Sequence, residues 1–226
     1  MPTPNRAYTR HVGIKFHEDG TVMPFSGNTI ICFVAPDTPL LGELLWMRET
    51  LQALACADHI GFLPPSSYHM TTFELLIDYW RQPQRWTPAL PLDAPIARTD
   101  VFFQQVVPRV PAPESFLMRF SSVRPETPAT LNIEPADEAT ALALRAYRDG
   151  LAEATGIRFP NHDTYQFHIT LGYVLVDFDE TAAAERDAVL RTINDRFRAS
   201  LRPFRLGPPQ LVFFNDMAEF TLSPER

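Results

Sequence analysis

Short runs of β-branched and aromatic residues alternate along this chain with stretches in which leucine recurs at helical spacing. Residues 28–36, NTIICFVAP, have the composition of a strand that stops at Pro36. A helix is predicted from residue 37 or 38 until shortly before Gly61, because apolar residues then repeat with a period near 3.6. Its stripe consists of Leu41, Leu44, Leu45, Leu51 and Leu54.

The same two periods predict the remaining elements. Helices are expected over 98–107, over 137–155 between Asp137 and a closing Gly156, and over 181–200. Strands are expected at 69–77, 115–123, 130–134, 165–176 and 208–214, with the clearest at 165–176. The proline- and tryptophan-rich segment 78–95 fits neither period and is predicted to be a long surface loop.

Along the chain the predicted elements follow the order strand, helix, strand, helix, strand, and this order then repeats once. Interleaved helices and short strands indicate an α+β or α/β domain. A length of 226 residues suits one domain, 1–226, built from two similar halves at roughly 1–110 and 111–226.

Composition narrows the class of protein. The formal net charge of -7 argues against a partner of long DNA or RNA, although it leaves room for one phosphate site. No apolar run reaches 18 residues and the opening segment lacks the apolar region of a secretory signal, so we expect a cytoplasmic protein without membrane contact. Cys32 and Cys56 form no metal-ligand pattern and are expected to be reduced and buried. We also expect a monomer.

Two of the six histidines lie in predicted strands with threonine two places later, His69 with Thr71 and His168 with Thr170. Residues i and i+2 of a strand project from the same face, so each pair presents an imidazole and a hydroxyl together. A neutral imidazole can deprotonate a nucleophile while a protonated one supplies the leaving oxygen with a proton. The two hydroxyls can donate hydrogen bonds to phosphate oxygens, so the pattern suits phosphodiester cleavage without a metal ion.

A third pair, His162 and Thr164, lies among turn-forming residues and is expected at most at the rim of the pocket. Zinc held by His162 together with the two motif histidines is an alternative, but no HExxH or clustered carboxylate accompanies it. We therefore predict no metal ion and no cofactor. Strand parity places Phe73 and Gln166 on the ligand side, where Phe73 is either a ring that stacks on a base or an ordinary core aromatic.

The motifs YHMTTF at 68–73 and FHITLGY at 167–173 resemble those of the 2H phosphoesterase superfamily, the LigT-like or cyclic-phosphodiesterase group. Residues 13–34 look like a branch of it that is catalogued as a domain of unknown function. The resemblance implies an α+β, two-lobed, pseudo-symmetric fold, in which antiparallel sheets carry outer helices and flank a central cleft.

By the same resemblance, His69 and His168 are the acid–base pair and Thr71 and Thr170 bind the phosphate. The implied substrate is a 2',3'-cyclic phosphate on a nucleotide or an RNA terminus. We favour His69 as the acid and His168 as the base, an assignment that the sequence leaves open. The alternative function is a module that binds a nucleotide or RNA end in the same cleft without turning it over.

Overall fold

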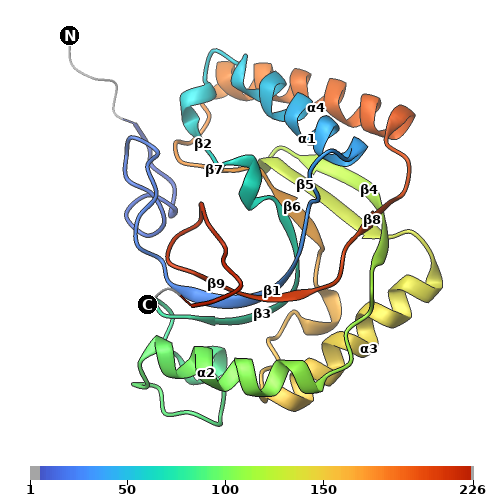
Figure 1. Ribbon diagram of the computed structural model, residues 1–226. Coiled ribbons are helices and arrows are strands. Elements are labelled where there is room, and N and C mark those ends of the chain that lie inside the picture. The colour runs from blue at the N-terminus through green and yellow to red at the C-terminus, as the bar shows by residue number, and fades with distance from the viewer. Residues whose placement is uncertain (1–5, 225–226) are drawn as a thin grey trace.

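A computed structural model describes residues 6–224, so the first five residues of the segment judged for a targeting signal lie outside the described residues. Its core is a curled seven-stranded sheet with the order β8-β4-β5-β6-β3-β1-β9, in which every neighbouring pair is antiparallel (Figure 1). A second sheet contains β2 and β7. The strands are β1 (Gly27–Phe33), β2 (Ile60–Phe62), β3 (His69–Ile77), β4 (Phe116–Arg124), β5 (Thr127–Pro135), β6 (His168–Thr170), β7 (Gly172–Val174), β8 (Phe204–Leu206) and β9 (Gln210–Phe214).

Within the described residues, four α-helices surround the sheet: α1 (Pro39–Gln52), α2 (Ile96–Val106), α3 (Glu138–Thr155) and α4 (Glu180–Ser200). Polar side chains cap three of their N-termini: Thr38 for α1, Asp137 for α3 and Asp179 for α4. Gly156 ends α3 with a φ of 70°, a left-handed conformation that glycine adopts without strain.

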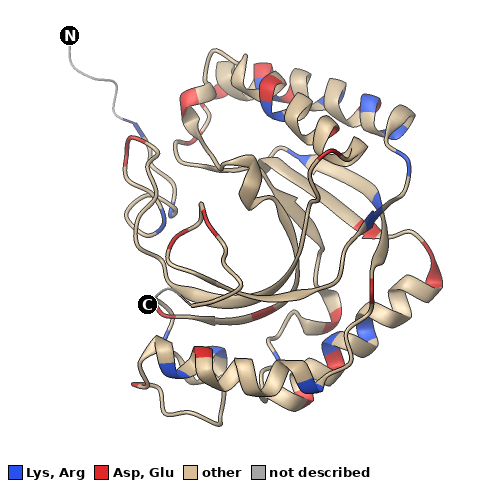
Figure 2. Ribbon diagram, in the orientation of Figure 1, with Lys and Arg blue, Asp and Glu red and all other residues tan. Residues whose placement is uncertain are grey.

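The helices form two groups on opposite sides of the curled sheet. Helix α4 packs on β4 and α1 packs on α4, whereas α3 lies against β3 and α2 against β9 (Figure 1). Charged residues gather on these helices and on the loops, and the motif strands are largely free of them (Figure 2). This arrangement confirms the predicted α+β, two-lobed fold with antiparallel strands and outer helices.

The predicted continuous strand over 165–176 is wrong, because the chain leaves the large sheet after Thr170. Residues 172–174 pair with β2 as β7, and Leu171 lies between the two sheets. The close approach of β2 requires Gly172, because a Cβ there would lie 2.8 Å from the Gly61 carbonyl oxygen. Pairing with a distant three-residue strand leaves no periodic signal, which is why β2 was not predicted.

Smaller differences concern the ends of elements. Strand β1 begins at Gly27, one residue before the predicted strand, and ends at Phe33, and the short strand β8 was not predicted. In α1 the fully buried stripe is Leu40, Leu44, Met47 and Leu51, so Leu41 and Leu45 are only partly covered.

The division near residue 110 stays a prediction. Strand β9, from the second half of the chain, pairs with β1 from the first half, and α1 packs on α4. Elements of the two halves are therefore packed together and do not form separate units. No helix among the described residues has the length and apolar character to span a membrane.

Candidate active site

The two HxT motifs lie on adjacent strands at the centre of the seven-stranded sheet. Met70 pairs with Ile169 in the antiparallel register, and both side chains are fully buried. This register sets His69 opposite Thr170 and Thr71 opposite His168. Because the two middle residues point into the core, both imidazoles and both hydroxyls project from the other face, into one cleft.

Each motif imidazole is oriented in the same way by its own strand. His69 Nδ1 lies 2.6 Å from the Ser67 carbonyl oxygen, and His168 Nδ1 lies 2.8 Å from the Gln166 carbonyl oxygen. A carbonyl oxygen only accepts, so Nδ1 carries the hydrogen in both rings. In a neutral ring Nε2 is then the unprotonated atom, free to take a proton from a nucleophile.

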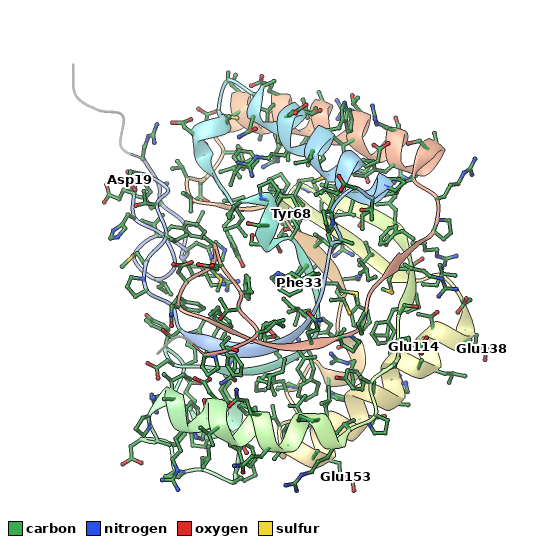
Figure 3. The ribbon with its side chains drawn as sticks, in the orientation of Figure 1. Asp19, Phe33, Tyr68, Glu114, Glu138 and Glu153 are labelled. Atoms are coloured by element: carbon green, nitrogen blue, oxygen red, sulfur yellow. The ribbon has the colours of Figure 1, made fainter. Side chains whose placement is uncertain are left out.

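The start of β3 is held firmly. The Val34 N–H donates to the Tyr68 carbonyl oxygen at 2.9 Å, and the buried Tyr68 hydroxyl accepts from Arg48 Nη1 at 3.2 Å. Phe33, the register partner of His69, and Tyr68 lie near the middle of the molecule, whereas the labelled acidic residues lie at its outside (Figure 3). The His69 backbone therefore sits in a rigid part of the fold.

Burial gives His69 an unusual acidity. The pKa of His69 is lowered to about 4, mainly by burial and in part by the charge of His168. The hydrogen bond to the Ser67 carbonyl oxygen acts against this lowering. The ring of Phe220 packs edge-on against the imidazole with centroids 4.4 Å apart. His69 is therefore neutral at pH 7 in the unliganded protein.

The cleft has a volume of about 770 Å³, which suits a small ligand. Besides both motifs it is lined by Gln166 and by polar residues of β5, Thr130 and Asn132, which stand opposite Thr170 and His168 in the register. These two β5 residues were not predicted, because one polar residue in an apolar strand gives no signal until its neighbouring strand is known.

The half-buried side chain of Tyr165 lies beside both motifs. The Tyr165 ring stacks against that of His168 with centroids 6.2 Å apart. Burial raises the pKa of Tyr165, and nearby Glu74 adds to the effect, while Arg148 and a hydrogen bond with Thr71 oppose it. Tyr165 thus contacts one residue of each motif.

The predicted position of Phe73 is wrong. Ile30 pairs with Phe73 but Ile31 pairs with Thr71, so β3 carries an extra residue, Thr72, in a β-bulge. Beyond the bulge the faces are exchanged. Phe73 is buried away from the cleft, and Glu74 lines the cleft in its place. The alternation of side chains between the two faces of a strand predicts orientation only where no bulge interrupts the pairing.

His162 lies outside the cleft, in the 3-10 helix η5 (His162–Thr164). It is buried, its Nε2 lies 2.9 Å from Asp149 Oδ1, and its ring contacts that of Phe73. Within residues 6–224, the cluster of possible metal ligands is Asp149, His162 and Asp163, and Arg158 binds both carboxylates. A zinc site that joins His162 to the motif histidines is thus absent from the described structure.

The proline-rich loop 78–95 also lies away from the cleft, since none of its residues lines it in the described structure. Thr87 Oγ1 donates to the Thr155 carbonyl oxygen at 2.7 Å, and Pro88 packs on Gly156. The loop therefore covers the end of α3, so its irregular sequence reflects packing there.

Three comparisons place the chain among known proteins. The family model 2H-phosphodiest, described as a domain of unknown function (DUF1868), matches residues 15–129. The crystal structure of ATU0111 from Agrobacterium tumefaciens str. C58, a conserved protein of unknown function, is 29% identical with a TM-score of 0.88, covering 94% of this chain and 90% of its own. The crystal structure of TT0787 of Thermus thermophilus is 14% identical with a TM-score of 0.42, covering 84% and 87%. Among curated proteins, none matches this chain.

The family match and the structural match agree with the paired motifs. The name of the family supports phosphoesterase activity without specifying a substrate. The match includes the first motif and the segment before it, and the structural likeness to ATU0111 extends over nearly the whole chain. This chain therefore belongs to the 2H-phosphodiest family, in the branch described as a domain of unknown function.

Proposed function

We propose that this protein opens 2',3'-cyclic phosphates of nucleotides or RNA ends by general acid–base catalysis, without a metal ion. One observation carries the proposal: the register that pairs Met70 with Ile169 directs two imidazoles and two hydroxyls into one cleft. Both imidazoles are held through Nδ1, so both Nε2 atoms are available for proton transfer.

The lowered pKa of His69 argues for the reverse of the assignment favoured from the sequence. A neutral His69 takes a proton from water through Nε2 as the water oxygen attacks phosphorus. The bond between phosphorus and one ribose oxygen breaks, and that oxygen receives a proton from Nε2 of a protonated His168. Water is thereby added across one ester bond, and the product is a ribose phosphomonoester.

The two threonines act on the charge that develops during this reaction. The non-bridging phosphate oxygens become more negative as water adds to phosphorus. Hydroxyl donors from Thr71 and Thr170, fixed on adjacent strands, stabilise that charge without needing to reorganise. The His168 Nδ1–H donates to the Gln166 carbonyl oxygen, which holds the ring in place and leaves Nε2 for the proton transfer.

Turnover of the four nucleoside 2',3'-cyclic monophosphates in EDTA tests the activity. His69→Ala and His168→Ala are each expected to lower kcat/KM by about 10²- to 10⁴-fold. His17→Ala, at an exposed position outside the cleft, serves as the control. Absence of ring opening with all four bases, or an unchanged rate in His69→Ala, rules out the enzyme. Stable binding with the ligand intact would identify the non-catalytic module instead.

An aryl phosphodiester separates the acid from the base. A nitrophenolate leaves without being protonated, so loss of the acid costs little with this substrate. We expect His168→Ala to retain most of its rate on the aryl diester and His69→Ala to lose it. The opposite result would restore the assignment favoured from the sequence.

A further inference from the structure

A second part of the cleft is formed by the loops that precede β1. Lys15, the single lysine of the chain, lines the cleft there. Its Nζ lies 4.9 Å from the ring centre of Phe25 and 4.6 Å from that of Tyr173, and 3.5 Å from the Tyr173 hydroxyl. The two rings thus hold the ammonium group in position without neutralising its positive charge.

Lys15 forms no ion pair with a carboxylate in the described structure, although Glu74 and Glu126 also line the cleft. A half-buried cation without a counter-charge attracts anions far more strongly than an exposed pair does.

Two neighbours of Lys15 add to this environment. Arg10 and His11 also line the cleft, and Arg10 has no carboxylate partner among residues 6–224. The pKa of His11 is lowered to about 4, mainly by burial and in part by the charges of Lys15 and Arg10, so both cations act at the same place.

This basic region lies close to the paired motifs along the chain. Tyr173, which holds Lys15, follows Thr170 by three residues, so their backbones are separated by at most about 10 Å. The Tyr173 hydroxyl also contacts Met217 Sδ at 3.7 Å, in the C-terminal segment whose Phe220 covers His69. A ribose phosphate at the motifs would therefore extend toward Lys15 within the same cleft.

We propose that Lys15, assisted by Arg10, binds a second phosphate of the ligand, remote from the phosphate held by the two motifs. The proposal rests on the function proposed above and names its substrate class: a nucleotide or RNA end that carries a further phosphate, such as a 5'-phosphate, besides the cyclic one. The net charge of -7 makes such a local basic site the natural point of entry for an anion.

Calorimetry with two non-reacting ligands tests the subsite independently of turnover. A nucleoside 3',5'-bisphosphate is expected to bind the wild-type protein about ten- to a hundredfold more tightly than the 3'-monophosphate of the same base, since a charge-assisted hydrogen bond has that effect. In Lys15→Gln the two affinities are expected to converge, and Lys15→Arg is expected to keep most of the preference. Arg191→Gln, an exposed change of equal charge on α4, is expected to keep it fully.

The outcomes separate the subsite from the reaction. A preference that depends on Lys15, without ring opening, supports the subsite and removes the proposed function. Ring opening with equal affinity for the two ligands overturns the subsite alone. Equal weakening of both ligands in Lys15→Gln, and not in Lys15→Arg, also overturns it, because Lys15 then acts on the phosphate at the motifs.

Discussion

Arg148 connects α3 to β3, the strand of the first motif, and to η5, and its removal has a calculable effect. The side chain is buried, donates to the Thr72 carbonyl oxygen at 2.5 Å and to the His162 carbonyl oxygen at 2.9 Å, and has no carboxylate partner in the described structure. Its guanidinium lies 4.6 Å from the ring centre of Tyr165, the residue that contacts both motifs. Burial lowers the pKa of Arg148 while nearby acidic groups oppose the effect.

Replacement by methionine keeps much of the apolar volume and removes the charge. Two hydrogen bonds from a charged donor contribute about 3 to 6 kcal/mol together. The desolvation of the cation, which methionine avoids, offsets about half of that. We therefore expect Arg148→Met to lower the free energy of unfolding by about 2 kcal/mol, or about 6 °C in Tm for a chain of this length.

Urea denaturation followed by circular dichroism measures this loss. Arg145→Met is the matched control, since Arg145 precedes Arg148 by about one turn of α3 and makes only an exposed pair with Asp163 at 3.5 Å. That substitution is expected to change the free energy of unfolding by less than about 1 kcal/mol. Equal stability of the two variants would show that the buried bonds of Arg148 to β3 and η5 add nothing to stability.

Three further predictions concern the same region. Gly172→Ala places a Cβ 2.8 Å from a β2 carbonyl oxygen and should lower the free energy of unfolding by about 1 to 3 kcal/mol. The control Gly42→Ala, in an open helical position, should not lower it. Equal urea midpoints for the two variants would refute this prediction. The pKa values of His11 and His69 are lowered to about 4, so the unfolded chain binds more protons between pH 4 and pH 6.5, and stability should fall as pH falls through that window. Urea midpoints at pH 7 and pH 5 should therefore differ less in the double variant His11→Gln/His69→Gln. Phe220→Ala exposes His69 and should raise its pKa in an NMR titration, and an unchanged value would assign the burial to other residues.

The sequence predicted the elements whose signals are local. Caps at Thr38 and Asp137 and the closing Gly156 lie where propensity alone places them. The two HxT motifs were recognisable because each fits within three residues of one strand. Such features depend on neighbours within one or two turns of chain, so a single sequence contains them in full.

The periodicity of the sequence does not predict which distant segments pair with one another. The bulge that turns Phe73 away from the cleft arises where β3 meets β1, and the break at Leu171 arises where the chain turns to meet β2. Lys15 shows the same limit, since a lone lysine in a loop acquires meaning only from the rings of Phe25 and Tyr173, which lie 10 and 158 positions away along the chain.

The two motifs are alike in sequence and in hydrogen bonding, yet their surroundings differ. Each imidazole donates through Nδ1 to the carbonyl two residues before it, as expected where two strands share one local design. The ring of Phe220 then covers His69, while Tyr165 stacks on His168 and also reaches Thr71. General acid–base catalysis needs one neutral and one protonated ring, and two equivalent histidines would share these states at random. In the reaction proposed above, we therefore expect the aromatic residues outside both motifs to determine which histidine begins neutral, and so to give a symmetric pair different roles.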